Sequence, residues 1–290
     1  MRAAVIHDGR IEVEERPDPL PGDGEILIRV RAAGINGADI AQRAGRYPAP
    51  AGAPQDIPGL ECAGETEGGE RVMALLGGGG QAELVTVHRT HALRVPDHLT
   101  WEQAGGFMEV FATAHDALVT QAQLREGERL LVNGAAGGVG VAAVQLGVQA
   151  GAHVTASARH HHDELRALGA DTDVDGEYDV ILELVGGDNL AANLRRLAPK
   201  GRVAIVGTGA GSTAEIEFGL LMRKRARIFG TVLRARNREE KEDVVRRLEG
   251  ALRQYELTVP VEETFPLERT QEAYERFRAG GKFGKIVVCP

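Results

Sequence analysis

The sequence predicts an α/β protein of two domains, in which a doubly wound parallel sheet is inserted into a β-rich domain. Between Arg129 and Leu233, short apolar runs alternate with segments of helical period, as expected for parallel strands joined by crossover helices. The sequence before this stretch, and residues 257–290 after it, are rich in strand patterns. The length of 290 residues also suits two domains, since single domains commonly have about 100–200 residues.

The first third of the chain is expected to form short strands joined by turns. Residues 25–32 (EILIRVRA) alternate apolar and charged side chains after Ile26, which is the period of a strand with one face in water. Glycine and proline are dense at 17–24 and 45–59. A further pair of strands is predicted at 71–76 and 82–88, separated by a flexible turn of four glycines.

Helical periodicity begins at residues 100–119, where Thr100 is a plausible N-cap with Gln103 three residues further on. Alternation of strands and helices follows, and it predicts the parallel sheet. The expected strands are 129–133, 153–157, 179–187, 201–207 and 227–233. The expected helices between them are 141–151, 163–169 and 189–198. Residues 257–290 are expected to form a strand, an amphipathic helix and a strand.

Composition excludes some classes of protein. The formal net charge of −8, with acidic and basic residues interspersed, provides no basic surface for nucleic acid, so no nucleic-acid partner is expected. The chain opens without a signal-peptide pattern and contains no long apolar span. We therefore expect a cytoplasmic protein without a membrane partner, in which Cys62 and Cys289 are reduced.

A glycine-rich turn, NGAAGGVG at residues 133–140, follows a predicted strand and opens a predicted helix. In that context it indicates a dinucleotide site, although Ala135 stands where the first glycine of the usual G-x-G-x-x-G pattern would be. Gly137 would let the backbone approach a pyrophosphate, and Gly140 would let the helix pack closely. The alternative is a turn that packs tightly without binding a ligand.

The end of the second predicted strand indicates which dinucleotide is bound. An acidic residue would hold the ribose 2′-hydroxyl of NADH there, but the sequence has Ser157 and Arg159 instead. A hydroxyl and a guanidinium suit a 2′-phosphate, so NADPH is the expected cofactor. Alternatively, Arg159 is a solvated surface charge. The histidines at 160–162 are expected to be a polar helix start, because consecutive helical residues project about 100° apart and cannot all bind one metal ion.

Taken together, several stretches resemble the zinc-free quinone oxidoreductases of the zeta-crystallin type within the medium-chain dehydrogenase/reductase superfamily. The resemblance implies a GroES-like β-rich catalytic domain from residues 1–112 and 252–290, a Rossmann NADPH-binding domain from 113–251, a substrate cleft at their junction and a homodimer. The matching stretches are 32–50, 57–64, 74–87, 108–118, 133–146, 182–187, 232–237 and 281–288.

A catalytic zinc ion is not expected. Zinc-dependent relatives have a cysteine ligand where this chain has Asn36, and a Gly-His-Glu motif where it has Gly59-Leu60-Glu61. Neither a thiolate nor an imidazole is available at those positions, whereas a catalytic zinc needs three protein ligands.

The resemblance also implies site residues. Asn36, Asp39 and Tyr47 would be the catalytic polar groups, with Tyr47 donating a hydrogen bond or a proton to a quinone oxygen. Their alternative roles are a loop asparagine, a helix-capping aspartate and a packing tyrosine. The implied cofactor contacts are Thr113 at the carboxamide, Gly137, Gly138 and Val139 at the pyrophosphate, Ser157 and Arg159 at the 2′-phosphate, Val185, Gly207 and Leu233 beside the nicotinamide, and Lys282 and Lys285 across the cleft.

The expected activity is NADPH-dependent reduction of a quinone in the interdomain cleft without a metal. A rival within the same class is reduction of the double bond of an enone or alkenal, because a hydride and a donor to an oxyanion serve both reactions. An alternative of another class is a non-catalytic NADPH-binding regulator or an RNA-binding protein, which the lack of a basic stripe disfavours.

Overall fold

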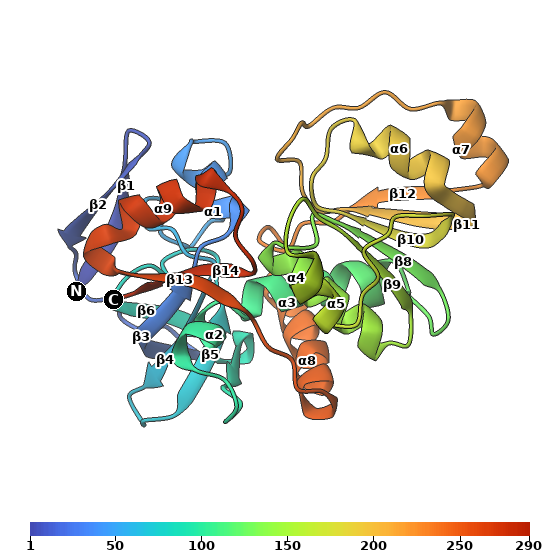
Figure 1. Cartoon of the computed structure of the whole chain (residues 1–290). Coiled ribbons are helices and arrows are strands. Elements are labelled where there is room, and N and C mark those ends of the chain that lie inside the picture. Colours follow the sequence, from blue (N-terminus) through green and yellow to red (C-terminus); the bar gives the residue numbers. More distant parts are fainter. The chain divides into compact units, whose positions relative to one another are not determined.

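The computed structural model describes residues 1–290 and divides the chain into two compact units. Unit 1 consists of Met1–Ala112 and Leu233–Pro290, and unit 2 of Thr113–Val232. Unit 1 is rich in strands and contains both ends of the chain, and unit 2 is an α/β unit with a parallel sheet (Figure 1). The expected fold class is confirmed. Unit 1 includes residues 233–251, which we had expected to lie in the nucleotide-binding domain.

Unit 1 contains a sheet of seven strands in the order β13-β14-β3-β4-β5-β7, with β6 paired to β3, and a separate hairpin β1-β2. The two strands predicted around the four glycines are present as β5 and β6, but they do not pair with each other, since β5 pairs with β4 and β7. The strands are β1 (Arg2–His7), β2 (Arg10–Glu15), β3 (Glu25–Gly34), β4 (Glu61–Thr66), β5 (Arg71–Leu75), β6 (Leu84–His88), β7 (Ala92–Arg94), β13 (Val261–Pro266) and β14 (Lys285–Cys289).

Strand β3 joins the beginning of the chain to its end. Its alternating side chains Ile26, Ile28 and Val30 are buried in one core cluster with residues of β4, β5 and β6. At its carboxyl end β3 pairs with β14, where Ala33 lies opposite Val288. This pairing brings Lys285, at the start of β14, beside the loop that follows β3, and so positions the polar cluster described below.

The helices of unit 1 differ from expectation at residues 100–119. Thr100 does cap a helix through Gln103, but that helix, α2 (Trp101–Gly105), ends after five residues. A Cβ at Gly105 would lie 2.5 Å from the Cβ of Ala32, so the helix end packs directly on β3. The rest of this stretch forms α3 (Met108–His115), which begins in unit 1 and ends in unit 2, and the π-helix η2 (Asp116–Gln121) of unit 2. The other helices of unit 1 are α1 (Gly37–Arg43), η1 (Arg89–His91), α8 (Arg238–Gln254), η3 (Leu267–Arg269) and α9 (Thr270–Ala279).

Unit 2 contains a five-stranded parallel sheet in the order β12-β11-β10-β8-β9. The chain starts in β8, goes to β9 on one side and then crosses to β10 on the other. The strand order therefore reverses between β8 and β10, which is where open α/β sheets bind ligands. The strands are β8 (Arg129–Asn133), β9 (His153–Ser157), β10 (Tyr178–Glu183), β11 (Leu197–Ile205) and β12 (Arg227–Gly230).

Helices cover both faces of this sheet (Figure 1). Leu131 is buried in a cluster with Leu194 of α6 and with side chains of α7, whereas its neighbour Leu130 faces α4, where a Cβ at Gly147 would come within 2.7 Å of it. This is the alternation expected of a strand buried on both sides. The helices are α4 (Gly138–Gln149), α5 (His162–Ala167), α6 (Asn189–Arg196) and α7 (Phe218–Lys224).

None of the helices is both long and apolar enough to cross a lipid bilayer. Cys62, which is buried in β4, and Cys289, at the end of β14, are both free thiols.

Candidate functional site

The glycine turn of unit 2 connects β8 to α4. Gly134 adopts a φ of +79°, the left-handed conformation that suits glycine, while Ala135 does not need it. The N–H groups of Gly134 and Ala135 both donate to the carbonyl oxygen of Ser157, at 3.0 and 3.1 Å. The turn is thus fastened to the end of β9, and the glycine that makes it possible stands one position before the usual one.

Gly137 and Gly140 differ in what surrounds them. A Cβ at Gly140 would lie 2.5 Å from the carbonyl oxygens of Gly134 and Ala135, so the helix can begin this close to the turn only with glycine there. A Cβ at Gly137 would meet nothing closer than the Gly134 oxygen at 3.6 Å. Gly137 caps α4, and Gly138 and Val139 are its first residues, whose N–H groups have no partner within a helix.

The end of β9 carries Ser157, which is partly buried, and Arg159, which is exposed. No acidic side chain lies between β9 and the start of α5 at His162. His161 bonds Glu164 and His162 bonds the Ala158 oxygen, so these two histidines form the polar beginning of α5. An exposed guanidinium beside the turn suits a phosphate group.

The loop after β10 packs against the glycine turn that follows the adjacent strand β8. Buried Glu183 accepts hydrogen bonds from the N–H groups of Val185 and Gly186, and also from Asn133 at the end of β8. A Cβ at Gly134 would lie 3.1 Å from the Val185 side chain, and the Gly207 N–H donates to the Glu183 carbonyl oxygen. Val185, Gly207 and the glycine turn therefore gather at the carboxyl ends of the strands.

The other residues expected to contact the cofactor lie in α3 and unit 1. Thr113 is in α3 and is 9% exposed, and Leu233, the first residue of the second segment of unit 1, is buried. Lys282 is partly buried, with its ammonium 4.3 Å from the centre of the Phe277 ring. Burial, and then the nearby charge of Lys285, lower the pKa of Lys282 to about 8.

Lys285 belongs to a buried polar cluster with Asn36 and Glu61. Its ammonium donates to the Glu61 carboxylate at 2.6 Å, to the Asn36 side-chain oxygen at 2.6 Å and to the Ile35 carbonyl oxygen at 2.9 Å. An ammonium has three N–H donors, and all three are used here. The expected contact of Lys285 with the cofactor would compete with these three bonds.

Asn36 is likewise engaged within this cluster. Its amide N–H group donates to Glu61 at 2.9 Å, and its oxygen accepts from Lys285. Asn36 was expected among the catalytic polar groups, and a hydrogen bond from its amide to a substrate would compete with the bond to Glu61. Glu61 belongs to the Gly59-Leu60-Glu61 segment, which was compared with the zinc motif of relatives. No sequence pattern indicated that its carboxylate pairs with Lys285, near the C-terminus.

Asp39 is fully buried and connects two loops. One carboxylate oxygen accepts the Asn36 N–H at 2.8 Å, which caps α1, and the other accepts the Gly59 N–H at 2.9 Å. Burial raises its pKa to about 6, although both hydrogen bonds oppose the shift. Asp39 thus makes the helix-capping contact that was its alternative role, and it also ties the loop that carries Asn36 to Gly59.

Tyr47 lies under the guanidinium of Arg234, which is 5.2 Å from the centre of its ring. Buried Arg234 donates to the carbonyl oxygens of Tyr47 and Gly77 and to the side chain of Gln42, so it fastens the loop after α1 to the glycine turn at 77–80. Burial, and then the carboxyl of Glu109, raise the pKa of Tyr47, and its phenol therefore keeps its proton at neutral pH.

Glu109 is a residue that the sequence analysis did not single out. Its N–H donates to Glu61 at 2.8 Å, and its side-chain Oε2 is buried without a hydrogen-bond partner. Burial, followed by the charges of Glu61 and Asp39, raises its pKa to about 8. The available signal was a lone acidic residue among apolar ones in the helix MEVFATAH.

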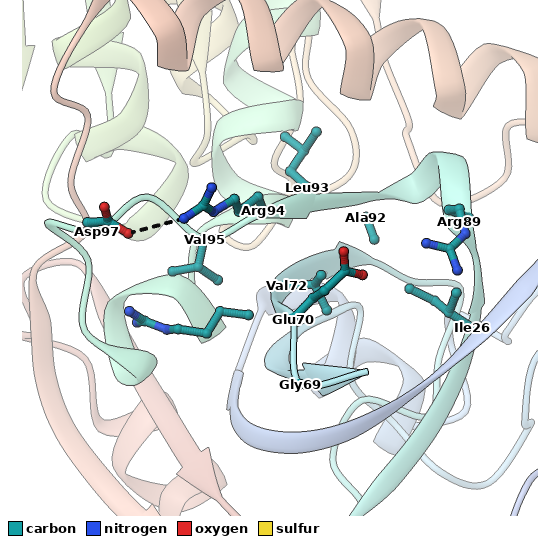
Figure 2. Close-up of a pocket in the computed structure, with 11 residues that line it drawn as sticks. Ile26, Gly69, Glu70, Val72, Arg89, Ala92, Leu93, Arg94, Val95 and Asp97 are labelled. Carbon is teal, nitrogen blue, oxygen red and sulfur yellow. Dashed lines mark ion pairs between the residues drawn. The ribbon is translucent and has the colours of Figure 1, made fainter. Parts of the chain in front are cut away.

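A surface pocket of about 550 Å³ in unit 1 lies elsewhere (Figure 2). It is bounded by β5, β7 and the turn at Gly69, and it contains an ion pair of Arg94 with Asp97 at 3.8 Å. None of the residues expected in the active site lines it, so it is not part of the candidate site.

The sequence matches two known protein families and several individual proteins. Residues 22–97 match the alcohol dehydrogenase GroES-like domain, and residues 150–288 match the zinc-binding dehydrogenase family. The chain is 38% identical over 208 residues to the polyketide synthase GfsB of Streptomyces halstedii, a match that covers 64% of this chain but 4% of that protein.

Quinone oxidoreductases match over nearly the full length. The enzyme of Lama guanicoe is 30% identical over 302 residues, covering 93% of this chain and 90% of its own. The quinone oxidoreductase of Thermus thermophilus, also solved with NADPH, superposes with a TM-score of 0.89 and 32% identity over 100% of both chains. The chain belongs to the quinone oxidoreductase family of the medium-chain dehydrogenases/reductases.

Proposed function

We propose that the protein is an NADPH-dependent quinone oxidoreductase that works without a metal ion. The observation that carries the proposal is the glycine turn of unit 2, where a helix N-terminus lies beside a strand end without an acidic residue. The similarity to quinone oxidoreductases, one of them solved with NADPH, supports the same cofactor and acceptor.

The residues of unit 2 fit the cofactor. Gly137 presents its backbone with open space where a side chain would begin, and the N–H groups of Gly138 and Val139 face the same end of α4. These three residues would hold the pyrophosphate, and Ser157 with Arg159 would hold the 2′-phosphate. When bound, NADPH supplies a hydride. Val185 and Gly207 would line the nicotinamide side, and Thr113, Leu233 and Lys282 remain proposed contacts.

The residues of unit 1 do not fit a zinc ion, although one matching family is named for zinc. Leu60, in the position of the histidine ligand, is fully buried and has no donor atom. The ammonium of Lys285 already lies 2.6 Å from both Asn36 Oδ1 and Glu61 Oε1. A second cation at these oxygens would be repelled by the ammonium, so the internal lysine supports a reaction without zinc.

Tyr47 is the proposed donor to the acceptor. No hydrogen bond within unit 1 uses its hydroxyl, and its raised pKa keeps that hydroxyl protonated. Its role would be to donate a hydrogen bond to the carbonyl oxygen on which negative charge develops. Arg234 holds the backbone and ring of Tyr47 in place, while Asn36 and Asp39 would position this region through Glu61 and Gly59.

A substrate panel tests the proposal. The purified protein should oxidise NADPH with ortho- or para-quinones, and Gly137→Val should abolish that oxidation. Turnover of alkenals and enones with no turnover of quinones would establish the double-bond reductase instead. Tight NADPH binding without turnover of either class would indicate a regulator, and salt-sensitive retention of RNA on a filter would indicate an RNA-binding protein.

We also propose that the protein is a homodimer. The outer edge of β12 pairs with no other strand, and an unpaired edge can be covered by a second copy. Phe218 and Met222, one turn apart on α7, are 72% and 73% exposed. Light scattering should give twice the mass of the chain, and a monomer mass for the unsubstituted protein would refute the dimer.

A further inference from the structure

The carboxyl of Glu109 is a buried acidic group to which the proposed reaction has not yet given a role. Its backbone is fixed on the polar cluster of Glu61, Asn36 and Lys285 by the N–H bond to Glu61. Its Oε2 has no hydrogen-bond partner, which is costly for a buried carboxylate but tolerable for a neutral acid. Glu109 as a whole is only partly buried, whereas this Oε2 atom is itself buried.

The charges around Glu109 favour its protonated form. Glu61 of β4 and Asp39 of α1 repel a further negative charge, and Lys285 and Arg234 attract it less strongly. Tyr47 and Lys241 also interact electrostatically with Glu109. Burial and these charges together hold its pKa at about 8, so at neutral pH most molecules carry a proton on this carboxyl.

The reaction needs such a proton. Reduction of a quinone to a hydroquinone adds two electrons and two protons, and a hydride brings both electrons and one of the protons. The other must come from the protein or from water. Tyr47 is a poor source because its pKa is raised, whereas an acid that titrates near the working pH is an efficient donor.

We propose that Glu109 is the proton donor of the quinone reduction, giving the proton of its carboxylic acid to the acceptor oxygen to which Tyr47 donates a hydrogen bond. The O–H bond of Glu109 breaks as the O–H bond of the hydroquinone forms. The resulting carboxylate then takes a proton from solvent before the next turnover. This inference rests on the proposed function, because it assumes an acceptor with a carbonyl oxygen.

Glu109→Gln tests the inference, since the amide keeps the shape of the neutral acid but has no transferable proton. Its kcat with a quinone should fall by about 100-fold or more, while the Kd for NADPH is unchanged. The kcat of the unsubstituted protein should fall as pH rises through about 8, and that decline should be absent in Glu109→Gln and present in Glu109→Asp. The matched control is Glu12→Gln, an exposed position of β2, which should behave as the unsubstituted protein.

A second readout does not depend on turnover. Infrared spectra at neutral pH should contain the carbonyl band of a protonated carboxyl group, which Glu109→Gln removes and Glu12→Gln retains. Absence of a Glu109-dependent band, or an unchanged kcat and pH profile in Glu109→Gln, would overturn the inference and leave the proposed function standing. Failure of the unsubstituted protein to reduce any quinone would overturn both the proposed function and the role of Glu109 in it, even with the band present.

Discussion

Lys285 and Glu61 form an ion pair with 2.6 Å between Nζ and Oε1, and their side chains are 2% and 0% exposed. Burying two charges is costly, and removing one partner leaves the other charge unpaired in the interior. Asn36 also accepts a hydrogen bond from this ammonium, at 2.6 Å, so the pair fixes the position of a proposed site residue as well as the stability of unit 1.

Lys285→Met should therefore destabilise unit 1 strongly. We expect the free energy of unfolding to fall by about 3–5 kcal/mol because Glu61 is left unpaired, and the double variant with Glu61→Gln should recover part of the loss. The single tryptophan, Trp101, lies on α2 of unit 1, so its fluorescence during urea unfolding reports on this unit. As a control, Arg31→Ala breaks an exposed pair with Glu65 and should cost less than about 1 kcal/mol. Equal losses in both variants would contradict the prediction.

Two glycines of the turn are predicted to have different roles, Gly137 in binding the cofactor and Gly140 in packing the helix. Gly137→Val should abolish NADPH binding and leave the folded state intact, because a Cβ there meets only one oxygen, at 3.6 Å. Gly140→Val should instead prevent unit 2 from folding, because its Cβ would lie 2.5 Å from two backbone oxygens. Circular dichroism measures folding, and quenching of NADPH fluorescence measures binding. Retained NADPH affinity in folded Gly137→Val would refute the assigned turn.

Arg159→Ala tests the preference for the phosphorylated dinucleotide. Loss of an exposed guanidinium from a phosphate contact should raise the KM for NADPH by about tenfold, equivalent to about 1.4 kcal/mol, and leave the KM for NADH nearly unchanged. Arg166→Ala is a suitable control, since Arg166 is an exposed residue of α5 that pairs with Asp163. If both cofactors were affected equally, Arg159 would be a surface charge, as the alternative interpretation of the sequence held.

Tyr47→Phe removes the hydroxyl that is proposed to donate a hydrogen bond to the quinone, and it keeps the ring under Arg234. The kcat for a quinone should fall by about 10- to 100-fold, while the Kd for NADPH stays constant because Tyr47 is not among the proposed cofactor contacts. Arg234→Lys should lower kcat as well, since an ammonium cannot reproduce the three hydrogen bonds that fasten this loop. An unchanged rate in Tyr47→Phe would leave Tyr47 a packing residue.

The sequence predicted most of unit 2 because its signals are local. Apolar runs and glycines mark the buried parallel strands and the turn at residues 133–140, and these patterns do not depend on distant residues. Prediction failed where the structure depends on contacts between residues far apart in the sequence. The contact of Gly105 with Ala32 ends a helix that periodicity alone would continue, and Lys285 finds its partner Glu61 at a separation of 224 residues. Glu109 was missed for the same reason, since its environment is assembled from Glu61 and Asp39.

The raised pKa of Glu109 predicts how the stability of unit 1 depends on pH. In the unfolded chain this carboxyl ionises near 4.5, and in the folded protein near 8. Between these values the folded state binds the proton more tightly than the unfolded state, so the contribution of Glu109 to stability is fully present below about 4.5 and is lost as pH rises to about 8. Asp39, with a pKa of about 6, contributes in the same direction at lower pH.

The effect of Glu109 is therefore measured by comparing variants. Unfolding followed by Trp101 fluorescence should show the unsubstituted protein losing stability relative to Glu109→Gln across this range, and Glu12→Gln should follow the unsubstituted protein. A constant difference between Glu109→Gln and the unsubstituted protein would mean that Glu109 ionises alike in both states, because only a difference in proton binding produces a slope with pH.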